Sequence, residues 1–189
     1  HGRDLTVVFG VLLVVLAMVM AKPLGFPLPW FVSLPLWFGL PLGGAAILAG
    51  SGALELLGLT RLNLRGVAVA AGGSLAMLAG LALTSTRAPA LDIAALWDSA
   101  IRPAFGEELI FRGLAFGVLF WRVKWSFKAA MLTTGLLFGA FHIPGAIFAG
   151  NLDEVWGTAL ITGAGGCWYA WLYMRWNRSV WVPITAHLT

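Results

Sequence analysis

Two adjacent glutamates and an arginine lie at the start of an apolar stretch, where charged side chains are costly. The stretch reads Pro103-Ala-Phe-Gly-Glu-Glu-Leu-Ile-Phe-Arg and stays apolar to Trp121. A charge at the centre of a transmembrane helix costs roughly 2.5–3.5 kcal/mol on insertion scales, so each one needs a function or a partner. Glu108 and Arg112 are four residues apart, on one helix face, and are expected to form an ion pair. Glu107 is rotated from them by about 100° and is free for chemistry.

Two histidines also lie inside apolar segments. His142 follows Leu136-Leu-Phe-Gly-Ala-Phe, and His187 follows Val182-Pro-Ile-Thr-Ala. Each alone would be a structural histidine more often than a functional one. Together with Glu107 they come from three segments, as expected when a helix bundle builds a polar site in its core. A carboxylate and a histidine can take a proton from water and return it to a leaving amine, which is general acid–base catalysis of amide hydrolysis.

The same residues leave other chemistries open. Two histidines and a glutamate are a ligand set of zinc hydrolases, so Glu107, His142 and His187 are the expected ligands if a metal binds. A metal-free site is the first expectation, because the chain has no His-Glu-x-x-His motif. Cys167 is the single cysteine, which excludes a multi-cysteine metal cluster. Buried Glu and His would also suit the proton relay of a transporter, and a Glu–Arg pair would suit a non-enzymatic membrane partner.

The composition places these groups inside a membrane. Of the 189 residues 60% are hydrophobic and 11% are charged, with a mean hydropathy of +0.89, whereas about a quarter of the residues in soluble domains are charged. A bilayer core about 30 Å thick needs roughly 20 apolar residues per helix. The sequence therefore predicts an all-α fold, a polytopic transmembrane helical bundle in a single domain. Membrane lipids surround it, and no nucleic-acid partner is expected, because Lys and Arg near membrane ends explain the net charge of +4.

About seven crossings are predicted, the last of them incomplete. They lie near residues 5–21, 36–58, 67–84, 104–121, 128–149, 155–174 and 182 to the end. The prolines in residues 22–35 predict an interfacial loop, because proline blocks a regular helix. Residues 90–101 are expected to form a short interfacial helix. Small residues are expected to let helix backbones approach closely, at Gly43, Gly44, Gly72, Gly73, Gly135, Gly139, Gly163, Gly165 and Gly166.

The distribution of basic residues predicts the orientation. With the N-terminus inside, eight Lys and Arg fall on the inner side and three on the outer side. The positive-inside rule then favours a cytoplasmic N-terminus. A compact chain with no targeting signal is expected in a prokaryotic plasma membrane. The inner group is Arg3, Arg61, Arg65, Arg122, Lys124, Lys128, Arg175 and Arg178, and the outer group is Lys22, Arg87 and Arg102.

Three motifs, in this order, resemble those of one membrane-protein family. The motifs are Glu107-Glu108-x-x-x-Arg112, Phe138-x-x-x-His142 and a late His187. Their order, spacing and apolar context are similar to those of the CPBP family of CAAX-protease and bacteriocin-processing proteins, also called the Abi family, and to type II CAAX prenyl proteases within it. The similarity covers roughly residues 95–189, which are expected to form the catalytic core, with residues 1–94 as N-terminal helices of the same bundle.

The resemblance implies an intramembrane endopeptidase that cuts a membrane-associated peptide, such as a prenylated C-terminus or a leader peptide. Glu107 would act as the base on a water, assisted by His142. His187 would help to hold the tetrahedral oxyanion, and no cofactor would be required. The site would be supported by the three remaining motif residues, Glu108, Arg112 and Phe138.

One further element of the family pattern is an Asn or Asp four positions after the late histidine. In this numbering it would be position 191, beyond Thr189. Because the loss of one oxyanion donor can cost about 10²–10³ in rate, a weak or inactive enzyme is an expectation for this chain. The family also includes members whose proposed role is immunity or regulation, so a non-enzymatic partner stays open as the alternative.

Overall fold

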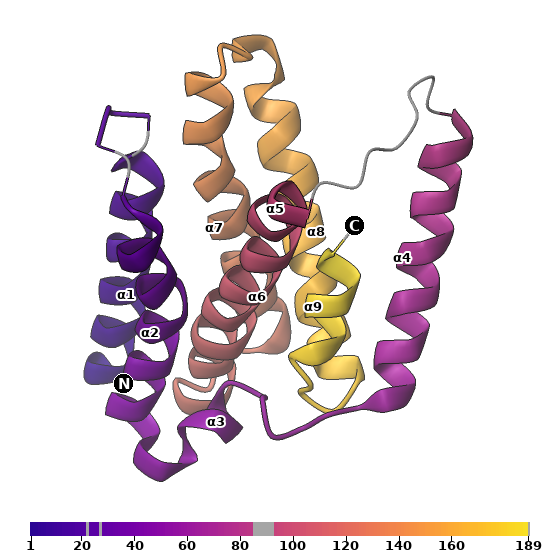
Figure 1. Ribbon diagram of the computed structural model, residues 1–189. Helices are drawn as coiled ribbons and strands as arrows, with labels where there is room; N and C mark the ends of the chain where they lie inside the picture. The colour runs from indigo at the N-terminus through magenta and orange to yellow at the C-terminus, as the bar shows by residue number, and fades with distance from the viewer. Residues whose placement is uncertain (22, 27, 85–92, 189) are drawn as a thin grey trace.

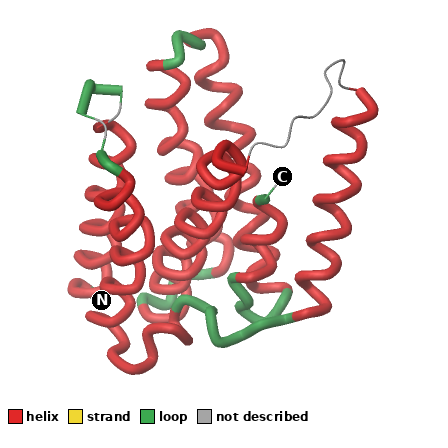
Figure 2. Tube along the Cα trace, viewed as in Figure 1, coloured by secondary structure: helices red, strands yellow, loops and turns green. Residues whose placement is uncertain are grey.

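The computed structural model describes residues 1–21, 23–26, 28–84 and 93–188. Within these ranges every regular element is a helix and no strand occurs (Figure 1 and Figure 2). The predicted all-α fold is therefore confirmed. Lys22, Arg87 and Thr189 lie outside the described residues, as do residues 90–92 of the expected interfacial helix.

Four helices of the described chain are long and apolar enough to cross a membrane. They are Gly2–Ala21, Trp30–Leu56, Leu64–Thr84 and Phe127–Phe148. A polytopic helical chain is thus confirmed, but with fewer qualifying spans than the seven expected. The segment over residues 102–122 carries several charges, and α8 (Val155–Arg175) is rich in Gly, Trp and Tyr, so both are less apolar. The seven residues of α9 (Trp181–His187) extend about 10 Å, a third of the bilayer core.

The second predicted crossing has different bounds in the structure. The N-terminal elements are α1 (Gly2–Ala21), α2 (Trp30–Ala49), η1 (Gly50–Gly52) and α3 (Ala53–Leu56). Pro35 and Pro41 lie inside α2, so the expected loop over 22–35 and the expected crossing over 36–58 are both wrong in extent. Helices in lipid tolerate proline because neighbouring groups satisfy the freed carbonyl. Gly50 has a φ of 54°, which ends α2.

The helix α4 (Leu64–Thr84) lies at the side of the bundle. It packs mainly against α9, and Figure 1 shows it beyond α9, away from α1 and α2. Ser74 Oγ donates a hydrogen bond to the carbonyl oxygen of Thr185 at 3.2 Å. Many of its large apolar side chains are exposed, as a helix that faces lipid requires. The helix predicted at 67–84 is confirmed as a candidate membrane span, with its start at Leu64.

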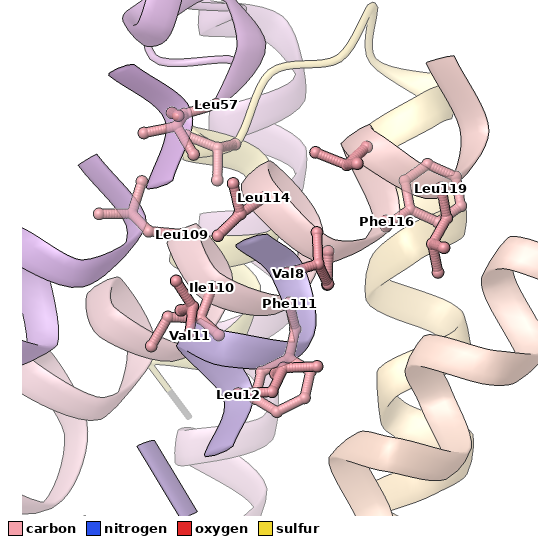
Figure 3. Packing of buried hydrophobic residues seen from close by; sticks show 14 of the residues in the cluster. Val8, Val11, Leu12, Leu57, Leu109, Ile110, Phe111, Leu114, Phe116 and Leu119 are labelled. Atoms are coloured by element: carbon pink, nitrogen blue, oxygen red, sulfur yellow. The ribbon is translucent and has the colours of Figure 1, made fainter. Parts of the chain in front are cut away.

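A continuous helical segment runs through the centre of the bundle. Its parts are α5 (Ile93–Leu96), η2 (Trp97–Ile101), α6 (Arg102–Glu108), η3 (Leu109–Phe116) and η4 (Val118–Arg122). The described part of the expected interfacial helix therefore continues into the fourth predicted crossing. All of η3 is buried, and it contacts α1, α2, α7 and α8, so it is apolar on nearly every side. Figure 3 shows Phe111 and Leu114 of η3 beside Val8 and Leu12 of α1.

The tightest pair of helices is α7 (Phe127–Phe148) with α8, joined through η5 (Leu152–Glu154). A Cβ added at Gly166 would lie 3.1 Å from the Cα of Gly135, and one added at Gly139 would overlap the carbonyl oxygen of Ala159. The expected close approach of backbones is confirmed at Gly135, Gly139, Gly163 and Gly166, whereas Gly44 packs against the side chains of Val7, Val11 and Leu114. The expectation is wrong where an added Cβ would meet open space, at Gly43, Gly72, Gly73 and Gly165.

The segments that carry most of the basic residues gather at one end of the bundle. The N-terminus, the α3–α4 connection, the start of α7 and the α8–α9 connection all lie at the lower end of Figure 1. At this end Arg122 Nε donates a hydrogen bond to Asp4 Oδ1 at 2.8 Å and ties η4 to α1. The predicted grouping of basic residues on a common side agrees with this arrangement.

Candidate active site

Glu108 and Arg112 form a fully buried ion pair at the junction of α6 and η3. Arg112 Nη1 lies 3.0 Å from Glu108 Oε1, and the two side chains are 1% and 0% exposed. Arg112 Nη2 also donates a hydrogen bond to the carbonyl oxygen of Gly166, on α8, at 3.3 Å. Buried charges are tolerated only when partners of this kind offset their desolvation. The pairing predicted from the four-residue spacing is confirmed.

Two aromatic rings enclose the guanidinium of Arg112. Its Cζ lies 4.3 Å from the ring centroid of Phe138 and 5.0 Å from that of Tyr169. A guanidinium is planar and weakly hydrated, so aromatic faces can replace water around it. Phe138 therefore lies where a supporting residue was expected. The arginine is held by α6, α7 and α8 at once.

The ion pair in turn fixes the orientation of His187. His187 Nδ1 lies 2.8 Å from Glu108 Oε1. A carboxylate oxygen accepts hydrogen bonds, so in this contact His187 Nδ1 is the donor. The other ring nitrogen, Nε2, then faces Glu107, 3.8 Å from Oε2. A chain of contacts thus leads from Arg112 through Glu108 and His187 to Glu107.

Glu107 combines burial with an unused oxygen. Its side chain is 16% exposed, and Oε2 is buried without a hydrogen-bond partner among the described residues. The distance of 3.8 Å to His187 Nε2 is too long for a direct hydrogen bond. A single water can bridge two polar atoms at such a separation. Arg112 thus pairs with Glu108 and not with Glu107 among the described residues, as the rotation of Glu107 along the helix predicts.

Glu107 and His142 line one cavity of about 210 Å³, which we call the inner cavity. His142 Nδ1 lies 2.8 Å from the carbonyl oxygen of Phe138. A carbonyl oxygen only accepts, so Nδ1 donates and Nε2 is left as an acceptor in the neutral ring. The other lining residues come from α1, α2, η3 and α7: Val15, Val19, Trp37, Phe111, Phe141 and Gly145.

One residue of this site was not predicted from the sequence. The ring of Tyr169 stacks on that of His187, with centroids 5.0 Å apart and an interplanar angle of 23°. Phe138 meets the same imidazole edge-on at 5.9 Å. The sequence gives no signal for this role, because Tyr169 lies in a run of aromatic residues that includes Trp168 and Trp171. Tyr169, and not Trp168 or Trp171, stacks on His187 because of the position in which α8 packs against α7.

The expected metal ligands do not converge. Within the described residues no group of three or more His, Cys, Asp or Glu side chains is placed to hold a metal ion. His142 lines the inner cavity, whereas His187 is turned to the two glutamates and is not among the lining residues. As placed, Glu107, His142 and His187 do not fit a zinc site. The steps proposed below therefore use no metal.

Comparison with known proteins identifies a family for this chain. The sequence model of the Rce1-like family, described as type II CAAX prenyl endopeptidase Rce1-like, matches residues 89–189, just over half of the 189 residues. The chain belongs to the Rce1-like family. Neither a curated protein nor a solved structure matches it.

The Rce1-like region holds the polar residues of the site and the aromatic residues that pack against them. Glu107, Glu108, Arg112, Phe138, His142, Tyr169 and His187 all lie between residues 89 and 189. The inner cavity needs more than this region, because Val15 and Val19 of α1 and Trp37 of α2 form part of its wall. The N-terminal helices are therefore a structural part of the site.

Proposed function

We propose that this protein is an intramembrane endopeptidase that hydrolyses a peptide bond of a membrane-associated substrate with a water activated by Glu107 and His142. Membership of the Rce1-like family supports protease chemistry. The observation that carries the proposal is Glu107 Oε2, a buried oxygen without a partner among the described residues, on a side chain that lines the inner cavity with His142. A base must have such an oxygen within reach of the water that it deprotonates.

In this mechanism Glu107 removes a proton from the water, whose oxygen attacks the carbonyl carbon of the scissile amide. His142 Nε2 accepts a hydrogen bond from the second O–H of the water, which stays on the attacking oxygen, and so orients the water. His187 acts with a proton on each ring nitrogen: Nδ1 donates to Glu108, and Nε2 donates to the tetrahedral oxyanion. The proton on Glu107 then passes to the leaving amine as the C–N bond breaks. One water is consumed, and a carboxylic acid and an amine are released.

The membrane arrangement follows as part of the proposal. We propose that the segment over residues 102–122 and α8 cross the bilayer beside the four candidate spans, and that the N-terminus is cytoplasmic. Residues 95–189 would supply the catalytic groups, and residues 1–94 would close the bundle around them. A prokaryotic plasma membrane is the proposed location. The substrate would be a prenylated C-terminus, a leader peptide or a transmembrane segment.

The test is a cleavage assay with purified protein in detergent. A panel of prenylated, non-lipidated and leader peptides would be incubated with wild type, Glu107→Gln and the control Glu154→Gln, each with and without a zinc chelator. Glu154 is exposed in η5 and lines neither the inner cavity nor the neighbouring cavity that the end of α1 and the start of α2 form. Cleavage should be lost only in Glu107→Gln and should survive the chelator. Mass spectrometry of the products identifies the bond.

Other outcomes separate the alternatives. Loss of cleavage with the chelator would reassign the site to a zinc hydrolase. Cleavage that persists in Glu107→Gln would remove Glu107 from the mechanism. No cleavage of any peptide by wild type would favour the non-enzymatic immunity or regulatory partner.

A further inference from the structure

A second and larger cavity lies beside the inner one. Its volume is about 830 Å³, and it is formed by the end of α1, the start of α2 and residues 97–102; we call it the outer cavity. Three tryptophans, Trp30, Trp37 and Trp97, dominate its apolar lining. Tryptophan prefers the boundary between lipid and water. The cavity is lined by residues from the end of α1 and the start of α2, and these helix ends lie opposite the N-terminus in Figure 1. A molecule at the membrane surface can therefore reach it.

The two cavities share part of their walls. Val19 and Trp37 line both of them. The ring of Trp37 covers Gly106, the residue before Glu107, so closely that a Cβ on Gly106 would lie 2.7 Å from Trp37 Cε3. Trp37 thus separates the outer cavity from the segment that carries the proposed base.

The volumes of the two cavities indicate that they hold different parts of a substrate. Ligand-binding pockets usually enclose about 300–1,000 Å³. The inner cavity, at about 210 Å³, is smaller than this range, whereas the outer cavity, at about 830 Å³, lies within it. The inner cavity has room for a water and the bond that it attacks. The residues that flank this bond need a neighbouring space, and the outer cavity adjoins it.

The lining of the outer cavity favours a peptide over a bare hydrocarbon chain. Beside the tryptophans it contains Ser33 and the ion pair of Arg102 with Asp98, in which Nε lies 3.4 Å from Oδ1. A peptide backbone has N–H and C=O groups that need partners when buried. A hydrocarbon chain offers none and would leave these polar side chains desolvated. A peptide with large apolar side chains matches both parts of the lining.

We propose that the outer cavity binds the substrate residues next to the scissile bond, with their apolar side chains among the tryptophans and their backbone near Ser33 and Arg102. Trp37 limits the size of the side chain that enters the inner cavity. This inference rests on the proposed function, since it assigns the substrate-recognition surface of that same site.

The first test reads binding without cleavage. Each non-lipidated peptide of the panel would carry benzoylphenylalanine two residues from the intended bond and would be photolysed with the Glu107→Gln variant in detergent. Adducts are expected in residues 28–37 and 97–102, located by peptide mass spectrometry. Adducts only elsewhere, from a peptide that wild type cuts, would overturn the inference and leave the proposed function intact. Adducts in these segments without any cleavage by wild type would uphold the binding surface and reject the protease.

The same experiment tests a lipid as the occupant. Unlabelled peptide should displace the adducts, and farnesol should not. Displacement by farnesol alone would assign the outer cavity to a lipid chain and overturn the inference.

The second test is steady-state kinetics on peptides that differ in one residue beside the bond. Trp97→Ala should raise KM about tenfold for peptides with Leu or Phe there, with kcat unchanged and little effect on peptides with Gly, because a hydrophobic pocket discriminates by about this factor. Trp37→Ala should admit larger side chains. Trp156, which is 73% exposed and lines neither cavity, provides the matched control Trp156→Ala. Equal changes of KM in Trp97→Ala and Trp156→Ala would contradict the inference.

Discussion

Replacing Arg112 by methionine should leave the carboxylate of Glu108 buried without its charge partner. The pair is 1% and 0% exposed, so neither side chain can turn to solvent. Removal of one partner of a buried pair typically costs about 3–5 kcal/mol in the free energy of unfolding. Methionine fills most of the space and keeps contacts with Phe138 and Tyr169, worth about 0.3–1.5 kcal/mol each. The loss therefore comes mainly from the uncompensated carboxylate.

The double variant Glu108→Leu with Arg112→Met separates stability from orientation. Replacement of a whole buried pair by apolar residues is often neutral or stabilising by about 1–4 kcal/mol, so this variant should regain the stability lost in Arg112→Met. It should still fail to cleave, because His187 loses the oxygen that lies 2.8 Å from its Nδ1. Unfolding in mixed SDS micelles gives the free energies, and cleavage of a peptide cut by wild type gives the activity.

Two results would refute this reasoning. A single Arg112→Met variant as stable as wild type would mean that the buried carboxylate finds another partner or takes up a proton at little cost. An active double variant would mean that Glu108 does not orient His187. The first result would mean that the contacts of Arg112 and Glu108 do not stabilise the protein. The second would mean that the contact of Glu108 with His187 is not needed for cleavage.

Three further variants test separate contacts. Tyr169→Leu should lower kcat about three- to tenfold with KM unchanged, since an aromatic pair contributes about 0.5–1.5 kcal/mol, while Tyr169→Phe, which keeps the ring, should behave as wild type in the same peptide assay. Asp4→Asn should cost no more than about 1 kcal/mol in the free energy of unfolding, because its partner Arg122 is 37% exposed; a loss of several kcal/mol would show that this tie between α1 and η4 is stronger than its exposure implies. Gly139→Ala should destabilise by about 1–3 kcal/mol, since its new Cβ meets backbone of α8, whereas Gly165→Ala, which points into open space, should be neutral or stabilising by about 0.5–1 kcal/mol in the same unfolding assay.

Features encoded over a few residues were predictable from the sequence. The Glu108–Arg112 pair follows from a four-residue spacing, which stays on one face of the helix even as α6 passes into the π-helical η3. The meeting of three apolar segments at Glu107 follows from the cost of leaving polar groups in lipid. His187 lies in α9, a short helix that begins at Trp181 and has Pro183 as its third residue. Pro183 there needs no N–H partner, so it does not interrupt the helix.

Features that depend on contacts between distant helices were not predictable. Tyr169 lies 57 positions after Arg112 in the chain, and its ring contacts depend on how deeply α8 packs against α7. The sequence does not distinguish a glycine that faces open space from one that faces a neighbouring backbone. Gly165 and Gly166 are adjacent in the chain, and of the two only Gly166 faces α7. The start of α2 at Trp30 was missed since proline rules derived for water overstate the cost of Pro35 in lipid.

The different roles proposed for Glu107 and Glu108 follow from one residue of rotation along α6. Glu108 Oε1 lies within 3.0 Å of Arg112 Nη1 and 2.8 Å of His187 Nδ1, and its side chain is fully buried. These contacts occupy Oε1, and the side chain of Glu108 lines neither the inner nor the outer cavity. The Oε2 atoms of both glutamates lack a hydrogen-bond partner among the described residues, but of the two side chains only that of Glu107 lines the inner cavity. In the proposed mechanism Glu108 therefore orients His187 and does not contact the substrate. Because Glu108 has this role, Glu107 can act as the base in the inner cavity.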